Sequence, residues 1–566
     1  MDIEELRARA QVWLADDPDP DSRAELRAVI EALPGSAADL TDRFAGPLTF
    51  GTAGLRGPMR AGPNGMNLAQ IRAAAAGLVA WLAARDAQGA LVIGYDARHR
   101  SRRFAEETAR VATGAGRRAL LLPRALPTPV LAHAVRLVGA CAGVMVTASH
   151  NPPQDNGLKV YLGASLGGAA GNGAQIVPPV DAEIEAAIRA VPSLSGVALG
   201  DTGELLTDSV LESYVDGAVA VLDLRTVSAK LRGNLVSAYT PMHGVGGEVL
   251  VKAFERAGFA SVASVPEQSA PDAAFPTVAF PNPEEPGAMD LVVGLAANVG
   301  ADIAIANDPD ADRCAVAIPT AGGWRTLSGD EVGILLADHL MRRGVRGTYA
   351  TTIVSSSLLR AMCAARGMPY AETLTGFKWI VRAAADDLRY GYEEALGYCV
   401  APGHVRDKDG ITAALLVAEL AAGLKADLRT LADRLDELAA EFGVYATDQI
   451  SVRVKELSAI DAAMGRLRAH PPASLLDQAV TSFEDLAPGA DVVVIRTGFG
   501  RVVVRPSGTE PKLKAYLEIV EPVRVAPTTA AGAGRRRGVE EVARARERAA
   551  GALASLRAEV SLALGL

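Results

Sequence analysis

Apolar runs of strand length alternate with helical segments along most of this chain, and the alternation starts anew twice. One series runs from Leu91 to the Ser149 region, a second from Asn234 to Asn307, and a third from Gly347 to Tyr398. Strands that alternate with helices are typical of α/β domains with parallel sheets. We therefore expect three similar α/β domains with mixed, mostly parallel sheets.

The last part of the chain has a different pattern. Short β-rich runs replace the alternation, and the Gly498–Gly500 turn between two of them suits a hairpin. These features predict a C-terminal antiparallel α+β domain. A length of 566 residues suggests roughly three to five domains. The expected boundaries are 1–205, 206–320, 321–446 and 447–566.

The structure of two segments outside this pattern can also be predicted. Residues 1–45 have helical character. Residues 523–538 are rich in Ala, Gly and Arg and are expected to form a mobile insertion. An amphipathic helix is expected over 539–556.

Composition narrows the class of protein. Hydrophobic residues make up 49% and charged residues 22%, the net charge is -9, and no long basic stripe is present. These values predict no nucleic-acid partner. The start has no pattern of a secretory signal, and no apolar stretch is long enough for a membrane span. The four cysteines are scattered without metal-ligand spacing, which favours a cytoplasmic protein with reduced thiols.

One polar motif follows an expected buried strand. The sequence VMVTASHNPPQDNGLKVY places Ser149 and His150 at the end of that strand, with Lys159 ten residues after the serine. Open α/β sheets bind ligands at the carboxyl ends of their strands. A Ser-His pair alone is more often a helix cap beside a surface histidine. The chain lacks a Gly-x-Ser-x-Gly elbow here, so esterase chemistry is not indicated.

A second motif, NDPDADR, is strongly acidic. Asp308, Asp310 and Asp312 alternate after another expected strand, and carboxylates this close repel one another unless a cation neutralises them. Oxygen ligands suit Mg²⁺ or Ca²⁺. Counted from Asp308, the sixth and twelfth positions hold Arg313 and Pro319, not the Gly and Glu of a calcium loop. The motif therefore favours Mg²⁺ over Ca²⁺, and an acidic turn without metal is the alternative.

A third motif, RPSGTEPKLK, combines an arginine, two hydroxyl side chains and a glycine. Such a segment can cradle a phosphate, because glycine lets backbone N–H groups approach an anion and arginine binds it in bidentate fashion. An ordinary β-turn with polar residues is the alternative. The residues concerned are Arg505, Ser507, Gly508 and Thr509.

Taken together, TASHNP, DPDADR and RPSGTEP resemble the motifs of the α-D-phosphohexomutases, the phosphoglucomutase/phosphomannomutase superfamily. The segments FGTAGLRG, GYDARHRS, GNGAQIVPP, TPMHGVGG, PNPEEPG, TGFKWI and EEALGY continue the resemblance in order, from about residue 48 to 518. The resemblance implies four domains around one central cleft and the activity of an intramolecular phosphotransferase. It would interconvert hexose 1-phosphate and hexose 6-phosphate, of glucose or mannose, through a 1,6-bisphosphate.

The resemblance also implies roles for single residues. Ser149 would carry the transferable phosphate as a phosphoserine, with His150 orienting it. One Mg²⁺ per chain would be held by Asp308, Asp310, Asp312 and the serine phosphate. Lys159 would be the general acid/base, with a pKa lowered by Arg56 and the metal.

Substrate binding is expected to involve several segments. Glu394 would bind sugar hydroxyls, Gly376 and Lys378 would contact substrate from another loop, and Arg313 would pin a carboxylate or a phosphate. The residues expected to hold the phosphate that is not transferred are Arg505, Ser507, Gly508 and Thr509, with help from Lys514. His404 is expected either to reach substrate or to lie on the surface.

One departure from the family pattern affects specificity. The sugar loop reads Glu-Glu-Ala-Leu-Gly, so Leu396 stands where hexomutases commonly have serine. In this respect the chain resembles the branch with phosphopentomutase and glucose-1,6-bisphosphate synthase, which are alternative activities.

A phosphoserine-based phosphatase and a non-catalytic sugar-phosphate-binding protein are the alternatives from other classes. We also expect a phosphosugar substrate, glucose 1,6-bisphosphate or a similar bisphosphate as activator, and a monomeric or dimeric state.

Overall fold

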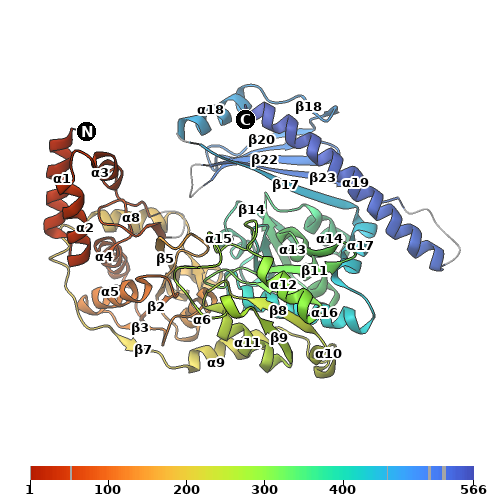
Figure 1. Ribbon diagram of the computed structural model, residues 1–566, viewed down its shortest axis with the longest axis horizontal. Coiled ribbons are helices and arrows are strands. Elements are labelled where there is room, and N and C mark those ends of the chain that lie inside the picture. Colours follow the sequence, from red (N-terminus) through yellow and green to blue (C-terminus); the bar gives the residue numbers. More distant parts are fainter. Residues whose placement is uncertain (1, 51–53, 455–456, 508–511, 525–530, 566) are drawn as a thin grey trace. The chain divides into compact units, whose positions relative to one another are not determined.

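The computed structural model describes residues 2–50, 54–454, 457–507, 512–524 and 531–565 (Figure 1). The chain forms two compact units. The first contains residues 1–332 and 377–426, and the second contains residues 333–376 and 427–566. Each unit is described by itself.

The first unit begins with three helices, as residues 1–45 predict. They are α1 (Ile3–Asp16), α2 (Pro20–Glu31) and α3 (Ala37–Arg43). Helix α2 has proline in its first turn and a side-chain cap from Asp19, which suit a helix start. Leu6, Leu26, Leu40 and Phe44 pack with Ala61 in one small core. These helices are thereby attached to the segment that follows β1.

A sheet of parallel and antiparallel strands forms the first α/β region. Its order is β1-β5-β4-β2-β3-β7, and β6 pairs with β5. Strands β4, β2, β3 and β7 are parallel, whereas β1, β5 and β6 are antiparallel additions. The strand bounds are β1 (Gly54–Pro58), β2 (Leu91–Tyr95), β3 (Ala119–Leu121), β4 (Ala142–Val146), β5 (Asp155–Leu162), β6 (Ala174–Gln175) and β7 (Glu204–Leu205). The helices of this region are α4 (Leu68–Ala84), α5 (Ser101–Gly114), α6 (Thr128–Leu137), α7 (Ala164–Gly171) and α8 (Val180–Arg189).

The second sheet has the order β12-β11-β10-β8-β9. Strands β10, β8 and β9 are parallel, and β11 and β12 add on in antiparallel fashion. The strand bounds are β8 (Val236–Thr240), β9 (Ser261–Ser264), β10 (Ile303–Ala306), β11 (Ala315–Thr320) and β12 (Gly323–Thr326). The helices before and between them are α9 (Ser209–Val219), α10 (Ala229–Gly233), α11 (Gly246–Ala257), η1 (Pro266–Gln268) and α12 (Asp290–Val299).

The rest of the first unit is a short segment that follows residue 376. It contains α15 (Phe377–Ile380), η2 (Ala385–Asp387), β15 (Leu388–Glu393), β16 (Gly397–Cys399) and α16 (Gly410–Ala426). Strands β15 and β16 form an antiparallel hairpin. Helix α16 is apolar on all sides and buried over most of its length, as expected for a helix in the interior of a domain.

The second unit contains a parallel strand pair and an antiparallel sheet. Strands β13 and β14 are parallel, and the antiparallel sheet has the order β17-β23-β22-β21-β20. The chain enters the unit within α13 (Gly329–Arg342), and its other elements are β13 (Thr348–Thr352), α14 (Leu358–Arg366), β14 (Tyr370–Thr373), α17 (Leu431–Phe442), β17 (Val444–Arg453), α18 (Leu457–Ala469), β18 (Ser474–Leu475), β19 (Gln478–Ala479), β20 (Ser482–Asp485), β21 (Val493–Arg496), β22 (Gly500–Pro506), β23 (Lys512–Glu521) and α19 (Ala531–Leu564). Strands β21 and β22 form the hairpin predicted at Gly498–Gly500.

The predicted C-terminal helix is longer than expected. Helix α19 begins at Ala531, eight residues before the expected start, so residues 531–538 are helical. The prediction of a mobile insertion is wrong for this part, because Ala and Arg are strong helix formers and outweigh the glycines. Residues 525–530 of that prediction lie outside the described residues. Among the described helices, none combines the length and the apolar character that crossing a membrane requires.

Candidate active site

Ser149 lies in the loop that follows β4, as the sequence predicts. Its side chain is 3% exposed, and its hydroxyl lies 3.0 Å from Oδ2 of Asp308. Its backbone N–H donates to Oγ1 of Thr147 at 2.9 Å. The φ of Ser149 is +52°, a left-handed conformation that residues other than glycine seldom adopt. The loop therefore holds this hydroxyl in an unusual backbone conformation beside the acidic cluster.

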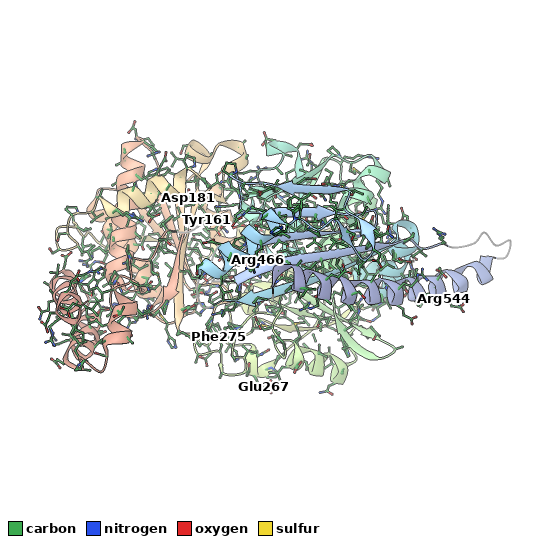
Figure 2. All side chains as sticks on the ribbon, turned by 90° about the horizontal axis from the view of Figure 1, so that it is seen from above. Tyr161, Asp181, Glu267, Phe275, Arg466 and Arg544 are labelled. Carbon is green, nitrogen blue, oxygen red and sulfur yellow. The ribbon has the colours of Figure 1, made fainter. Side chains whose placement is uncertain are left out.

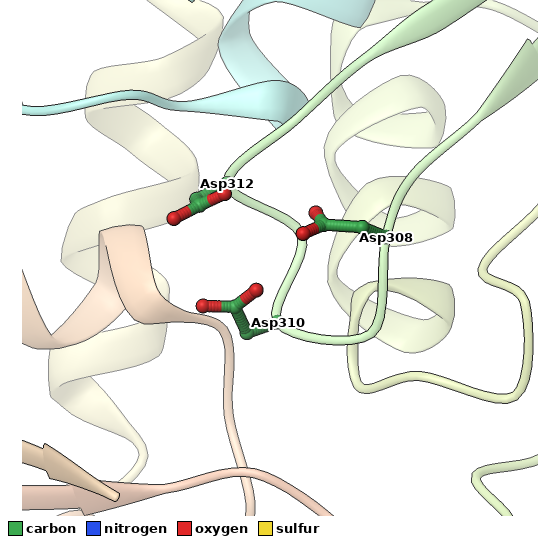
Figure 3. A group of neighbouring side chains, drawn as sticks. All are labelled: Asp308, Asp310 and Asp312. Atoms are coloured by element: carbon green, nitrogen blue, oxygen red, sulfur yellow. The ribbon is translucent and has the colours of Figure 1, made fainter. Parts of the chain in front are cut away.

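The three aspartates lie on the loop between β10 and β11, and their carboxylates converge (Figure 3). All three are fully buried, and one oxygen from each lies within 4.8 Å of the others. Oδ1 of Asp310 and Oδ1 of Asp312 have no hydrogen-bond partner among the described residues. Buried oxygens without donors are costly unless something binds them. The donor set, three carboxylates of which two have an oxygen without a hydrogen-bond partner, therefore fits a hard divalent cation.

Cationic side chains from other segments neutralise this cluster. Nζ of Lys159, on β5, donates to Oδ2 of Asp310 at 2.7 Å and to Oδ2 of Asp312 at 2.8 Å. Nζ of Lys408 lies 3.5 Å from the same oxygen of Asp312. The Thr128 hydroxyl, at the start of α6, donates to Oδ2 of Asp310 at 2.6 Å. The acidic loop is thus held by residues distant in sequence.

The three carboxyl groups differ in their electrostatics. Burial and the neighbouring carboxylates Asp310 and Asp312 raise the pKa of Asp308 well above its ordinary value. Burial also opposes ionisation of Asp312, but Lys159, Lys408 and Arg313 outweigh it and hold the pKa of that carboxyl low. The pKa of Asp310 is lowered as well, since Lys159 outweighs burial and the repulsion from Asp312.

Lys159 lies at hydrogen-bond distance from two carboxylates. Burial alone would lower its pKa, but contact with Asp310 and Asp312 raises it above its ordinary value, because two carboxylates this close stabilise the ammonium form. The lowering of this pKa by Arg56 and a bound metal stays a prediction. His150 shows the opposite effect. Burial and the positive charges of Arg313 and Arg56 lower its pKa, so its ring is neutral at pH 7.

The other predicted residues near the acidic cluster are His150, Arg56 and Arg313, and each has its own contacts. His150 Nδ1 lies 3.3 Å from the Ser149 hydroxyl. Arg56, on β1, donates to the Asn151 side chain at 3.0 Å. Arg313 donates its backbone N–H to Oδ1 of Asp308 at 3.0 Å, and its guanidinium pairs with Glu284 at 3.2 Å. Arg313 thus pins a carboxylate, one of the two roles predicted for it.

The sugar loop lies between β15 and β16 and contains Glu394. Gly397 forms a bridge with Arg313, which places this loop beside the acidic loop. A Cβ at Gly397 would lie 2.4 Å from the side chain of Lys408, so a larger residue there would displace that lysine. Burial lowers the pKa of Lys378, on α15.

Leu396 of the sugar loop is buried. Its side chain is 3% exposed and packs in an apolar cluster with Met242, Met289 and other residues of the second sheet region. Its φ is +61°, and its carbonyl accepts from the N–H of Cys314. The departure from serine at this position therefore provides packing that anchors the loop.

The predicted phosphate cradle belongs to the second unit. Arg505 lies on β22, and the N–H of Ser507 donates to the carbonyl of Lys512 at 2.7 Å, which closes the ends of the loop. Lys514, on β23, has its Nζ 6.0 Å from the ring centre of Tyr516. Gly376, also of this unit, has a φ of +111°. Gly508 and Thr509 lie outside the described residues.

His404 neither lies free on the surface nor joins the acidic cluster. Its ring lies 4.7 Å from that of His133 and 5.1 Å from that of Tyr214. Burial, with the nearby His133 and Arg136, lowers the pKa of His404 to about 3. The position of His404 is therefore explained by its packing against His133 on α6 and Tyr214 on α9.

Several residues of the site were not predicted. Thr128, Thr147 and Lys408 contact Asp310, Ser149 and Asp312 respectively. The same holds for Asp96, whose carboxylate accepts from the hydroxyls of Ser101 and Thr147. A signal existed for Asp96, because the segment GYDARHRS contributes to the family resemblance, but no role followed from it.

Comparisons with known proteins identify the family of this chain. The chain matches the models of all four phosphoglucomutase/phosphomannomutase domains. Alpha/beta/alpha domain I matches residues 47–194, domain II matches 212–322, domain III matches 328–442, and the C-terminal domain matches 429–530. A probable phosphomannomutase of Haemophilus influenzae is 45% identical over 463 residues, which cover 80% of this chain and 93% of that protein. The chain belongs to the phosphoglucomutase/phosphomannomutase family.

Two further relatives extend the comparison. A phosphopentomutase of Mus musculus is 34% identical over 567 residues, which cover 90% of this chain and 89% of the relative. A crystal structure from Thermus thermophilus, assigned to the phosphomannomutases, is 26% identical and has a TM-score of 0.67. The match covers 88% of this chain and 99% of that one.

Family membership confirms two predictions. The fold is the predicted set of three α/β domains with mixed sheets and a C-terminal antiparallel domain. The chain is an enzyme of the phosphomutase type, and its relatives support the predicted phosphohexose mutase activity. The exact domain boundaries and the roles of single residues stay predictions.

Proposed function

We propose that this family member interconverts hexose 1-phosphate and hexose 6-phosphate, of mannose or glucose, through a phosphoserine at Ser149. The observation that carries the proposal is the 3.0 Å contact between the Ser149 hydroxyl and Asp308 within a buried carboxylate cluster. A hydroxyl beside a cation site at the end of a strand is suited to receive and return a phosphoryl group.

Two transfers make up the reaction. A hydroxyl of the hexose monophosphate attacks the phosphorus on Ser149. The phosphorus–Oγ bond breaks as the new bond to the sugar oxygen forms, and the sugar hydroxyl loses its proton. After the resulting 1,6-bisphosphate has turned, Oγ attacks its other phosphate. The bond from that phosphorus to the sugar breaks, and the sugar oxygen takes up a proton.

Asp308, Asp310 and Asp312 would hold one Mg²⁺, together with the serine phosphate. The ion would supply charge neutralisation for the phosphoryl group in transfer. The buried, unpartnered oxygens of Asp310 and Asp312 support this assignment.

Lys159 is proposed to move the protons of the two steps. Its Nζ is bound to two of the proposed metal ligands, which hold it in the ammonium form. That form can donate a proton to a leaving sugar oxygen. Accepting a proton requires that Asp310 and Asp312 be engaged elsewhere, and coordination of both carboxylates to a cation would have that effect.

Sugar recognition is proposed for Glu394 and Lys378 in the first unit, and phosphate binding for Arg505, Ser507 and Lys514 in the second. Pentose phosphate is the second candidate substrate. The Glu-Glu-Ala-Leu-Gly loop and the phosphopentomutase relative favour it. Glucose 1,6-bisphosphate is proposed as the activator that first phosphorylates the serine.

A substrate panel tests the proposal. We would measure kcat/KM for the 1-phosphates of glucose, mannose, ribose and deoxyribose, with Mg²⁺ and glucose 1,6-bisphosphate. The hexose phosphates are expected to give the higher values, with inorganic phosphate released far more slowly than product. A higher kcat/KM for a pentose phosphate would show that the substrate is a pentose phosphate and not a hexose phosphate. Phosphate release as fast as isomerisation would instead show a phosphatase.

A further inference from the structure

Arg98 binds the backbone of the serine loop with both ends of its guanidinium. Nη2 donates to the carbonyls of Ser149 at 2.6 Å and Asn151 at 2.5 Å. Nη1 donates to the carbonyls of Pro152 at 2.9 Å and Asp155 at 3.2 Å. One side chain thus holds four carbonyls over seven residues of the loop, and its hydrogen bonds do not involve the reactive hydroxyl.

Asp96 joins this contact to the other side of Ser149. Its carboxylate lies 3.3 Å from Nε of Arg98 and accepts the Thr147 hydroxyl at 2.7 Å. Thr147 in turn accepts the backbone N–H of Ser149. The N–H of Ser149 is therefore held through Thr147, and its carbonyl is held directly by Arg98. Such a two-sided hold explains how a serine keeps a φ of +52°.

An aromatic ring from the second sheet region covers Arg98. Phe275, labelled in Figure 2, has its ring centre 5.0 Å from the guanidinium carbon and is 3% exposed. This distance is suitable for a cation–π contact, which strengthens where water is excluded. The N–H of Asp272 donates to the carbonyl of His243, and the N–H of Phe275 donates to the carbonyl of Asp272. These bonds fix the turn that carries the ring.

We propose that Arg98, covered by Phe275, is a positioning residue for phosphoryl transfer. It holds Ser149 in the left-handed conformation that directs Oγ toward Asp308. The inference rests on the proposed phosphoserine function, and it adds a role for two residues that do not touch the transferring group. Because Phe275 belongs to the same sheet region as the acidic loop, the contact also ties the serine loop to that region.

The first test is Arg98→Lys, which keeps the charge but cannot reach four carbonyls. Small displacements of a reacting group can lower rates by about 100-fold, and we expect a fall of about that size in kcat. KM for the sugar phosphate should change less than about twofold, because the hydrogen bonds of the Arg98 side chain go to the serine loop and to none of the predicted substrate residues that the structure describes. Arg102→Lys is the matched control, since Arg102 is exposed on α5 and pairs only with Glu106 among the described side chains.

A direct readout is phosphate uptake by Ser149. Each protein is first freed of phosphate and then given glucose 1,6-bisphosphate and Mg²⁺, and the phosphorylated fraction is followed by intact mass. Arg98→Lys should take up phosphate more slowly by the same factor as its loss of kcat. A role in stability alone would lower the melting temperature and leave this rate unchanged for the folded fraction.

The second variant, Phe275→Leu, keeps an apolar side chain and removes the ring. We expect a smaller loss, about fivefold in the uptake rate, in line with the size of a cation–π contact. Phe275→Tyr keeps the ring and should restore the rate. Phe280→Leu is the control, because Phe280 is 51% exposed.

The outcomes separate the two proposals. If the unaltered protein takes up no phosphate on Ser149, the proposed function fails. If it does, and Arg98→Lys takes up phosphate at the same rate, the positioning role is wrong. Should Arg98→Lys not fold, Phe275→Leu decides: an uptake rate equal to that of the unaltered protein would overturn the inference.

Discussion

The serine loop and the acidic loop lie together, yet they are held in different ways. The serine loop is held through its backbone, by Thr147 on one side of Ser149 and by Arg98 on the other. The acidic loop is held through its side chains, where Lys159 and Lys408 contact its carboxylates. The first arrangement determines the backbone geometry without using the hydroxyl, which lies beside Asp308. The second offsets charge repulsion and leaves carboxylate oxygens free for a cation.

Removing the hydroxyl is the strongest test of this difference. Ser149→Ala is expected to abolish mutase activity, with a loss of about 10⁴-fold or more, as for other covalent nucleophiles. The backbone hold should survive, so the melting temperature should stay within a few degrees. Steady-state kinetics and a thermal melt check both points. Ser195→Ala, at an exposed serine, is the control, and retention of full activity by Ser149→Ala would contradict the proposal.

Weakening the acidic loop should have the next largest effect. Asp310→Ala removes one predicted metal ligand and the acceptor of Lys159 and Thr128. Loss of one preorganised electrostatic group costs about 100-fold or more in kcat, and we expect at least that here. Activity should be compared in Mg²⁺ and in chelator, and Mg²⁺ binding measured by calorimetry. Asp302→Ala, at a surface carboxylate that pairs with Lys425, is the control. Full activity of Asp310→Ala in chelator would refute the metal site.

Asp409, outside both loops, offers a contrast to the acidic loop, because this buried carboxylate has only neutral hydrogen-bond donors among the described residues. It accepts the Tyr214 hydroxyl and the N–H groups of Ile411 and Thr412, and burial raises its pKa to about 6. Since this value lies above the ordinary 3.8, its contribution favours folding below pH 4 and is lost as pH rises to about 6.

Asp409→Asn removes this titration and keeps an acceptor oxygen. The unaltered protein should therefore lose stability relative to Asp409→Asn between pH 4 and 6, by about 3 kcal/mol as an order of magnitude. Denaturant unfolding at several pH values measures the difference. A constant difference across this range would show that neutral hydrogen bonds suffice to keep this carboxylate charged.

The smallest effect is expected in the sugar loop, which is held by packing. Leu396→Ala removes a buried side chain from the apolar cluster and should cost about 2 kcal/mol of stability. It should also raise KM for sugar phosphates, because the loop loses its anchor. Leu396→Met keeps the volume and is the control. Unchanged KM in Leu396→Ala would show that the loop needs no such anchor.

Residues of short motifs could be predicted, and residues brought in by folding could not. Ser149, Asp308, Asp310 and Asp312 follow strands whose apolar runs are evident in the sequence. Lys408 is 96 positions from Asp312, and no local pattern relates the two. The same applies to Arg98, which is 51 positions before the carbonyl that it binds.

Local sequence also misled where tertiary contacts decide. The glycines of 523–538 suggested a mobile segment, yet its part from Ala531 onward is the start of α19. Leucine at position 396 suggested a change in substrate specificity, whereas its side chain packs into the core of another sheet region.

From the sequence alone came the domain types and the predictions of a phosphoserine and of an acidic cation site, because each depends on residues that are close in the chain. The charge state of Lys159, the anchor of Leu396 and the hold of Arg98 on Ser149 were decided by the tertiary structure. Each of these depends on contacts between residues about 50 to 150 positions apart, and the strength of such contacts depends on burial that only the folded chain provides.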